Sequence, residues 1–129
     1  EENFFVEKML GTDPIKPFSE EVMNEYRKPY LNSGEDRRPT LDWPRQIPID
    51  REPIEVHEEV KSNLSFMLES ELPKLLIIGD PGRLMKGQLI EFCRKFKNQT
   101  EVTVEGNHFL QEESPKEIAE AINDWIKTI

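Results

Sequence analysis

The fold class of this chain is decided by the stretch Leu75-Leu76-Ile77-Ile78-Gly79-Asp80-Pro81-Gly82. It opens with consecutive apolar residues and ends in residues that favour turns. Such a run, without polar alternation, is typical of a strand that is buried on both faces in a parallel sheet. A second, shorter strand with alternating character is predicted for Glu101-Val102-Thr103-Val104-Glu105. The sequence therefore predicts an α/β fold.

Helical patterns follow each of these strands. The first helix is predicted from the spacing of Leu89, Ile90, Phe92, Cys93 and Phe96. The second opens at Ser114-Pro115-Lys116-Glu117, which fits a capping box with proline at the first helical position. Two strands cannot bury the run 75–78 alone. We therefore expect more of the sheet to come from another chain, or from assembly between copies.

The region before residue 71 is rich in proline and predicts short helices. Seven of the ten prolines lie in the first 53 residues. Asn3 is expected to cap a helix that ends at Gly11, and Ser19 to cap a second one. Pro53 suits the first turn of a longer helix.

Composition excludes several classes of protein. The 129 residues carry 26 acidic and 17 basic side chains, and the net charge of −9 disfavours a nucleic-acid surface. No apolar run approaches the roughly 20 residues of a membrane span, and no signal peptide opens the chain. We therefore expect a cytoplasmic protein that contacts neither nucleic acid nor membrane. One cysteine and two distant histidines give no disulfide framework and no metal-ligand spacing.

His108 is the strongest candidate for chemistry. It lies in Gly106-Asn107-His108-Phe109, just past the second predicted strand, at the sheet edge where ligands gather in open α/β folds. It can serve as a general base, or it is a loop histidine bonded to a neighbour.

Two other polar residues are weaker candidates. Asp80 is either an acid at the end of a strand or a turn-stabilising residue. His57, beside Glu58 and Glu59, is expected to be solvated. No nucleophile elbow accompanies His108, so its active site is unfinished within this chain.

Five groups of residues recur in the order and spacing of a known family. They are Asn3-Phe4-Phe5-Val6-Glu7 with Met9-Leu10, Tyr26-Arg27-Lys28-Pro29-Tyr30, the run from Arg37 through Asp42-Trp43-Pro44 to Pro48, Leu72-Pro73-Lys74-Leu75 leading to Asp80-Pro81-Gly82, and His108-Phe109-Leu110-Gln111-Glu112 with Ser114-Pro115. In these motifs the chain resembles the haloalkane dehalogenase family of α/β-hydrolases, which includes the Renilla-type luciferases. The resemblance covers essentially all 129 residues.

The resemblance implies that the chain is the C-terminal part of an α/β-hydrolase fold. Residues 1–70 would be the end of the helical cap, and residues 71–129 the last strands and helices of a mostly parallel sheet. His108 matches the catalytic histidine, which activates the water that hydrolyses an alkyl-enzyme ester. The Asp nucleophile would lie in an N-terminal part, supplied by a second chain or a second copy. Gly82 matches the position where some members carry the acid partner, so we expect a Glu from that part, with Asp80 as a backup; no cofactor is implied.

The resemblance also assigns a substrate site. Phe5 and Pro44 match groups around the halide and the substrate. The pocket walls match Phe4, Met9, Trp43, Ile47, Leu84 and Phe109. Asp13 and Arg83 match the mouth of the access tunnel, where a pair between them would narrow the entrance.

Three functions remain open from the sequence. The first is a dehalogenase that releases halide from a small halogenated hydrocarbon, with the N-terminal part present. The second is a coelenterazine luciferase on the same fold. The third is a non-catalytic fragment or assembly module. We favour the dehalogenase because it is the broader activity of the family, and we expect the 129-residue chain alone to be inactive.

Overall fold

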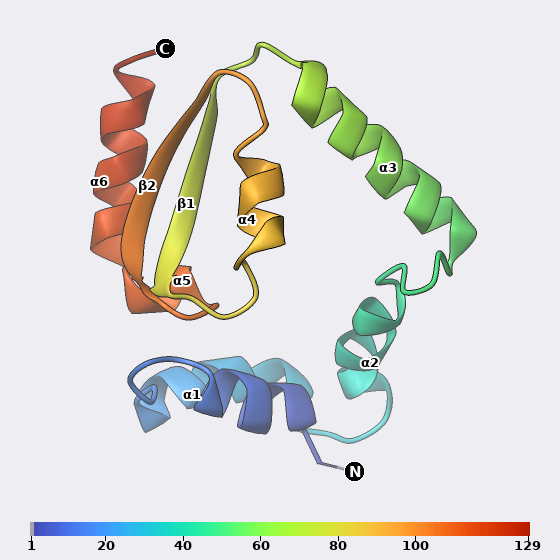
Figure 1. The fold of residues 1–129 in the computed structure, drawn as a ribbon. Helices are drawn as coiled ribbons and strands as arrows, with labels where there is room; N and C mark the ends of the chain where they lie inside the picture. The colour runs from blue at the N-terminus through green and yellow to red at the C-terminus, as the bar shows by residue number, and fades with distance from the viewer. Residues whose placement is uncertain (1) are drawn as a thin grey trace. The chain divides into compact units, whose positions relative to one another are not determined.

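A computed structural model describes residues 2–129, which divide into two compact units. The first unit contains residues 2–12 and Pro17–Ser65, and the second contains Asp13–Lys16 and Phe66–Ile129. The first unit is helical, and the second has the predicted order of strand, helix, strand and helix (Figure 1). No helix in the described part of the chain combines the length and apolar character needed to cross a membrane.

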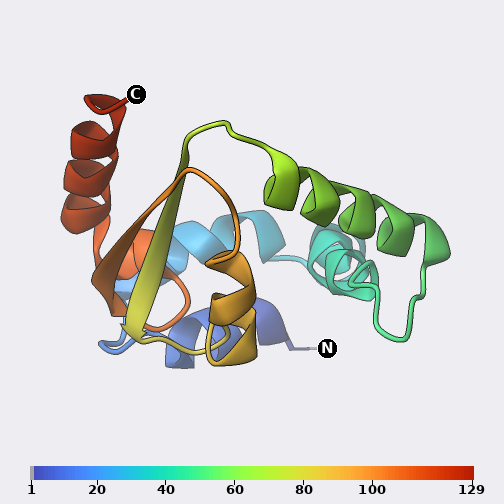
Figure 2. The ribbon, with the colours of Figure 1, turned by 45° about the horizontal axis from the view of Figure 1, so that its top comes forward.

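The second unit is built on two parallel strands. β1 (Lys74–Pro81) pairs with β2 (Gln99–Gly106) from Lys74 opposite Gln99 to Pro81 opposite Gly106. Parallel pairing requires a crossover, and α4 (Gln88–Cys93) lies in that connection. α4 and α6 (Pro115–Ile126) flank opposite sides of the strand pair (Figures 1 and 2). The predicted α/β architecture is confirmed, and both strands are longer than the sequence pattern indicated.

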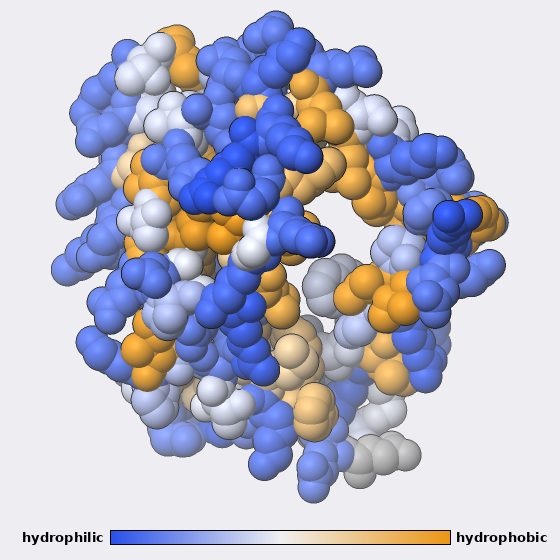
Figure 3. Space-filling model, in the orientation of Figure 1, coloured by the Kyte–Doolittle hydropathy of each residue, from blue (hydrophilic) through white to orange (hydrophobic). Residues whose placement is uncertain are grey.

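Two strands leave much of the apolar surface uncovered. Within residues 2–129 the buried hydrophobic side chains are Val6, Leu10, Met23, Ile78 and Val104. The run 75–78 was expected to be buried on both faces, but only Ile78 is buried and its three predecessors are half-buried. Apolar atoms are also exposed along α3 (Ile54–Glu69), where Phe66 is 58% exposed (Figure 3). The physical reason is the one anticipated from the sequence: a two-stranded sheet offers too little surface to cover its own apolar residues.

The first unit consists of short helices joined by turns. These are η1 (Phe5–Leu10), α1 (Glu20–Arg27), η2 (Lys28–Tyr30), η3 (Glu35–Arg37) and α2 (Arg38–Arg45), followed by most of α3. Ser19 caps α1 as predicted, and its hydroxyl accepts from the main-chain nitrogen of Val22 at 3.3 Å. The predicted cap at Asn3 is wrong. The helix begins one residue later, and Asn3 Oδ1 is buried without a hydrogen-bond partner in the described structure.

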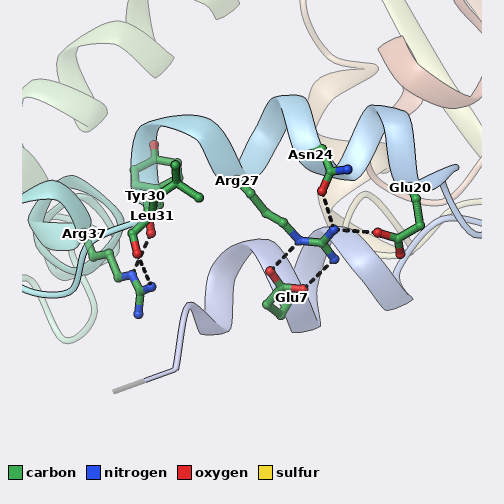
Figure 4. A network of polar contacts seen from close by, with 7 residues as sticks. All are labelled: Glu7, Glu20, Asn24, Arg27, Tyr30, Leu31 and Arg37. Atoms are coloured by element: carbon green, nitrogen blue, oxygen red, sulfur yellow. Dashed lines mark hydrogen bonds and ion pairs between the residues drawn. The ribbon is translucent and has the colours of Figure 1, made fainter.

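Arg27 joins η1 to α1 (Figure 4). Its Nε and Nη2 donate to the two carboxylate oxygens of Glu7 at 2.8 and 2.9 Å, and its Nη1 donates to Glu20 at 2.7 Å and to Asn24 at 2.9 Å. The bonds from Arg27 hold the pKa of Glu7 below its ordinary value, so this carboxylate stays charged to a lower pH than an unpaired glutamate. A planar guanidinium that serves both oxygens also fixes the direction of the contact.

The second unit has a similar contact between α4 and β2. Arg94, just after α4, donates to both carboxylate oxygens of Glu101 at 2.8 and 2.7 Å and to Glu91 at 2.6 Å. These bonds lower the pKa of Glu101. The crossover helix is thereby tied to the strand that follows it.

The region between β2 and α6 departs from the sequence expectation. A single helical turn, α5 (Leu110–Glu113), precedes α6 and was not predicted. α6 begins at Pro115 as expected, with Ser114 at the N-cap position, but the Ser114 side chain makes no capping hydrogen bond. The Ser114 hydroxyl instead donates to the main-chain oxygen of Glu105 at 2.6 Å, because the chain turns back against the end of β2.

Candidate functional site

His108 lies in the loop that joins β2 to α5. It comes two residues after the end of β2, and its side chain is exposed. The imidazole contacts the ring of Phe109 edge-on, with 4.9 Å between the ring centroids and 67° between the ring planes. An exposed imidazole at the carboxyl edge of a parallel sheet is in a suitable place to exchange protons with a bound molecule.

Two hydrogen bonds close the His108 loop at its base. Ser114 bonds the main-chain oxygen of Glu105, as described above. Glu113 Oε2 accepts from the main-chain nitrogen of Asn107 at 2.9 Å. The backbone on the N-terminal side of His108 is therefore fastened to the last residue of α5 and to the residue after it.

Asp13 and Arg83 are in contact although they are 70 residues apart in the sequence. The Arg83 guanidinium donates to Asp13 Oδ1. The two side chains that the sequence analysis considered as a pair are therefore in contact. The Asp13 side chain is 3% exposed whereas that of Arg83 is 57% exposed. Asp13 Oδ2 is buried and has no hydrogen-bond partner within residues 2–129. Asn107 Nδ2 also donates to the main-chain oxygen of Asp13 at 2.6 Å.

Position 82 has no room for an acidic side chain. Gly82 is buried with φ +63°, and a Cβ there would lie 2.5 Å from the main-chain oxygen of Gly79. Its main-chain nitrogen donates to the oxygen of Gly106 at 3.0 Å. Asp80 lies within β1, opposite Glu105, and is exposed.

The first unit holds an open cavity of about 800 Å³. Four of the predicted substrate residues line it, together with Asn3: they are Phe4, Phe5, Met9 and Pro44. Trp43 and Ile47 are 68% and 50% exposed and lie outside this lining. The volume is within the range of small-molecule sites, about 300–1,000 Å³. In the second unit Leu84 is 59% exposed in the loop after β1, and Phe109 is half-buried.

No group of three or more His, Cys, Asp or Glu side chains gathers closely enough to hold a metal ion in the described residues. His57, expected to be solvated, is half-buried on α3.

Comparison with known proteins shows what the chain is similar to. No protein-family model matches it. A haloalkane dehalogenase from Sphingobium indicum is 46% identical over 129 residues, which is all of this chain and 44% of that protein. The crystal structure of a haloalkane dehalogenase from Bradyrhizobium elkani USDA94 superposes on 98% of this chain with a TM-score of 0.90 and 35% identity. Over its whole length, the chain is similar to one segment of the haloalkane dehalogenases, which are α/β-hydrolases.

The family includes a relative with different chemistry. The coelenterazine h 2-monooxygenase from Renilla reniformis is 36% identical over 131 residues, again covering all of this chain and 42% of that protein. This chain spans less than half the length of the family members it matches. The expectation that the chain forms part of an α/β-hydrolase fold is confirmed.

Sequence reasoning did not single out Glu113 or Asn107 for the site. Glu113 stands beside Glu112 in an acidic pair, and the family motif includes Glu112 but not Glu113. Asn107 precedes His108 directly, but its partner Asp13 is 94 residues away in the chain. Only the folded arrangement brings these groups together.

Proposed function

We propose that this chain is the histidine-bearing, C-terminal part of a haloalkane dehalogenase. Residues 1–70 belong to its helical cap and residues 71–129 to its main sheet. An N-terminal part of the same fold, joined to this chain or separate from it, supplies the Asp nucleophile and the acid partner of His108. The substrate is a small halogenated hydrocarbon, and the products are halide, alcohol and a proton.

The reaction has two covalent steps. A carboxylate oxygen of the Asp nucleophile attacks the carbon that bears the halogen, an oxygen–carbon bond forms, and the halide leaves with its electron pair. Water then attacks the carbonyl carbon of the alkyl-enzyme ester while His108 takes a proton from that water. The bond between the carbonyl carbon and the alkyl oxygen then breaks, and that oxygen takes the proton from His108 and leaves as the alcohol. The carboxylic acid that remains releases a proton to water, which regenerates the carboxylate. His108 acts in the second step and not in the first.

The observation that carries the proposal is the place of His108 in a chain that is 46% identical throughout to a haloalkane dehalogenase. The exposed side chain follows directly on a parallel strand, where a general base is accessible to a bound ester. The need for a further part is supported by the uncovered apolar side chains of α3 and by the half-buried run in β1.

The pocket residues take their roles from the family. Phe5 and Pro44 surround the halide. Phe4 and Met9, which line the cavity of the first unit, are assigned to its apolar wall. The resemblance alone assigns substrate contacts to Trp43 and Ile47 of the first unit and to Leu84 and Phe109 of the second. Apolar walls suit a haloalkane, which offers no hydrogen-bonding groups beyond the halogen.

A chimera tests the proposal. Residues 1–129 replace the matching segment of the Sphingobium indicum dehalogenase, which provides the remaining part of the fold. We expect the chimera to release bromide from 1-bromobutane, measured by ion chromatography. A second chimera, in the 45% identical dehalogenase of Mycolicibacterium smegmatis, guards against a mismatch with one scaffold. Folded chimeras that release no bromide would contradict the proposal.

The same chimeras discriminate between the two activities of the family. The higher identity to dehalogenases, 46% against 36% for the monooxygenase, favours halide release. We expect no light from coelenterazine. Light emission without bromide release would show that the chain supports luciferase activity and not dehalogenation.

The contact between Asp13 and Arg83 is proposed to narrow the tunnel mouth. Removing both side chains, in Asp13→Ala with Arg83→Ala, should speed the entry of a bromoalkane and raise kcat/KM up to about tenfold, within the usual range of association-rate changes. The double variant is preferred because Arg83→Ala alone leaves a buried carboxylate unpaired, which is destabilising.

Steady-state bromide release from 1-bromobutane and 1-bromohexane measures this effect. Lys86→Ala is the matched control, since it removes a positive charge from the same loop without touching Asp13. Unchanged kinetics in the double variant, or an equal gain in the Lys86 control, would rule out a gate.

A further inference from the structure

The segment Asp13–Lys16 is held in the second unit although residues on both sides of it belong to the first. Three contacts fasten it to the loops that follow the strands and to α5. Arg83, after β1, donates to the Asp13 carboxylate, and Asn107, after β2, donates to the main-chain oxygen of Asp13. The main-chain nitrogen of Ile15 donates to Glu113 Oε1 at 2.7 Å.

The carboxylate of Glu113 connects this segment with the His108 loop. Its Oε1 accepts from Ile15, and its Oε2 accepts from the main-chain nitrogen of Asn107 at 2.9 Å. Charge-assisted hydrogen bonds of this kind are stronger than those between neutral groups. Glu113 also lies beside Gly106, since a Cβ added at Gly106 would lie 3.3 Å from Oε2 and 3.4 Å from the Glu113 Cβ. Glu113 therefore bonds the residue before His108 and lies next to the one before that.

The imidazole takes its position from this backbone. His108 is exposed. Among the described residues, the aromatic ring that its imidazole contacts is that of the next residue, Phe109. A general base must lie within hydrogen-bond reach of the proton it removes. A displacement of 1 Å costs about 10²-fold in rate. A group that fixes the peptide before His108 therefore controls how well the base is placed.

We propose that Glu113 is a positioning residue for His108, which it places by clamping the main chain of Asn107 to the segment Asp13–Lys16. This inference rests on the proposed function. It assigns to Glu113 an effect on the hydrolysis of the alkyl-enzyme ester and none on its formation, because His108 acts only in hydrolysis.

The two-step reaction separates positioning from a general structural role. When ester formation is followed by hydrolysis, kcat/KM contains only substrate binding and ester formation, whereas kcat contains both steps. A misplaced base slows hydrolysis, so kcat falls, KM falls with it, and kcat/KM is unchanged. A variant that merely loses folded protein lowers kcat and kcat/KM by the same factor.

The experiment compares Glu113→Ala and Glu113→Gln in the active chimera. We expect Glu113→Ala to lower kcat up to about 10²-fold with kcat/KM unchanged, and the alkyl-enzyme to accumulate in acid-quenched samples analysed by mass spectrometry. Glu113→Gln keeps one acceptor oxygen and should fall between Ala and the parent. Glu117→Ala, an exposed carboxylate on α6, is the matched control and should behave as the parent.

Amide hydrogen exchange gives an independent readout of the clamp. The amides of Ile15 and Asn107 should exchange faster in Glu113→Ala than in the parent. Unchanged kcat in both variants, or an equal fall of kcat and kcat/KM, would overturn the positioning role whatever the exchange rates. A parent chimera that releases no bromide contradicts the proposed function instead, so the two failures are distinguishable.

Discussion

His108→Phe in the chimera is expected to release one equivalent of bromide per enzyme and then to stop. The Asp nucleophile still displaces the halide, since that step does not use the imidazole. The ester then persists because phenylalanine cannot take a proton from water. The loss of steady-state turnover should be about 10²–10⁴-fold, the usual contribution of a general base.

Mass spectrometry of the intact protein measures this outcome. The variant should gain the mass of one butyl group in place of a hydrogen after incubation with 1-bromobutane, whereas the parent should not retain it. His57→Phe is the matched control, because it removes the other histidine of the chain, on α3, and should leave turnover intact. Full turnover in His108→Phe would remove His108 from the mechanism.

Gly79→Ala is expected to lower the stability of the fold. A Cβ at Gly79 would lie 2.7 Å from the main-chain oxygen of Gly106 and 2.7 Å from Leu110 Cδ2. The first atom belongs to the neighbouring strand and cannot move without disturbing the parallel ladder. Overpacking of this kind costs about 1–3 kcal/mol in the free energy of unfolding. Movement of Leu110 would also displace α5 and the loop that carries His108.

Chemical denaturation of the chimera measures the change in the free energy of unfolding. Gly11→Ala serves as the control, because Gly11 has φ −73° and an added Cβ would lie at an ordinary distance of 3.5 Å from Met23 Cε. That control should be neutral or slightly stabilising. A Gly79→Ala variant as stable as the parent would mean that the strand ends have more freedom than the contacts at Gly79 indicate.

The parts of the fold that follow a regular period were predictable. The apolar run at 75–78 and the alternation at 101–105 gave both strands, and their parallel pairing followed from the helix between them. α5 was not predictable, because a single turn is too short to show helical spacing. The hydroxyl of Ser114 fitted a helix cap on sequence grounds, yet a main-chain oxygen of β2 is its partner. A local sequence pattern cannot reveal that a main-chain oxygen of another element will take the hydrogen bond of a capping hydroxyl.

The candidate site was also predictable only in part. Its place after the second strand singled out His108, whereas the predicted pocket residues and the pair of Asp13 with Arg83, which are far apart in the chain, came only from the resemblance. Glu113 remained hidden because its two partners are main-chain nitrogens, which every residue except proline carries. A side chain that recognises backbone leaves no complementary residue type in the sequence. Its role could be inferred only from the positions of Ile15 and Asn107 in the fold.

The segment Asp13–Lys16 also limits how this protein can be dissected. The polypeptide enters the second unit for these residues, leaves it, and returns at Phe66. A recombinant piece that starts at residue 66 would lack the acceptor for Asn107 Nδ2 and the carboxylate that pairs with Arg83, and half of the Glu113 clamp would be empty. The strand-bearing unit is therefore discontinuous in sequence, and no single cut of the gene yields it whole.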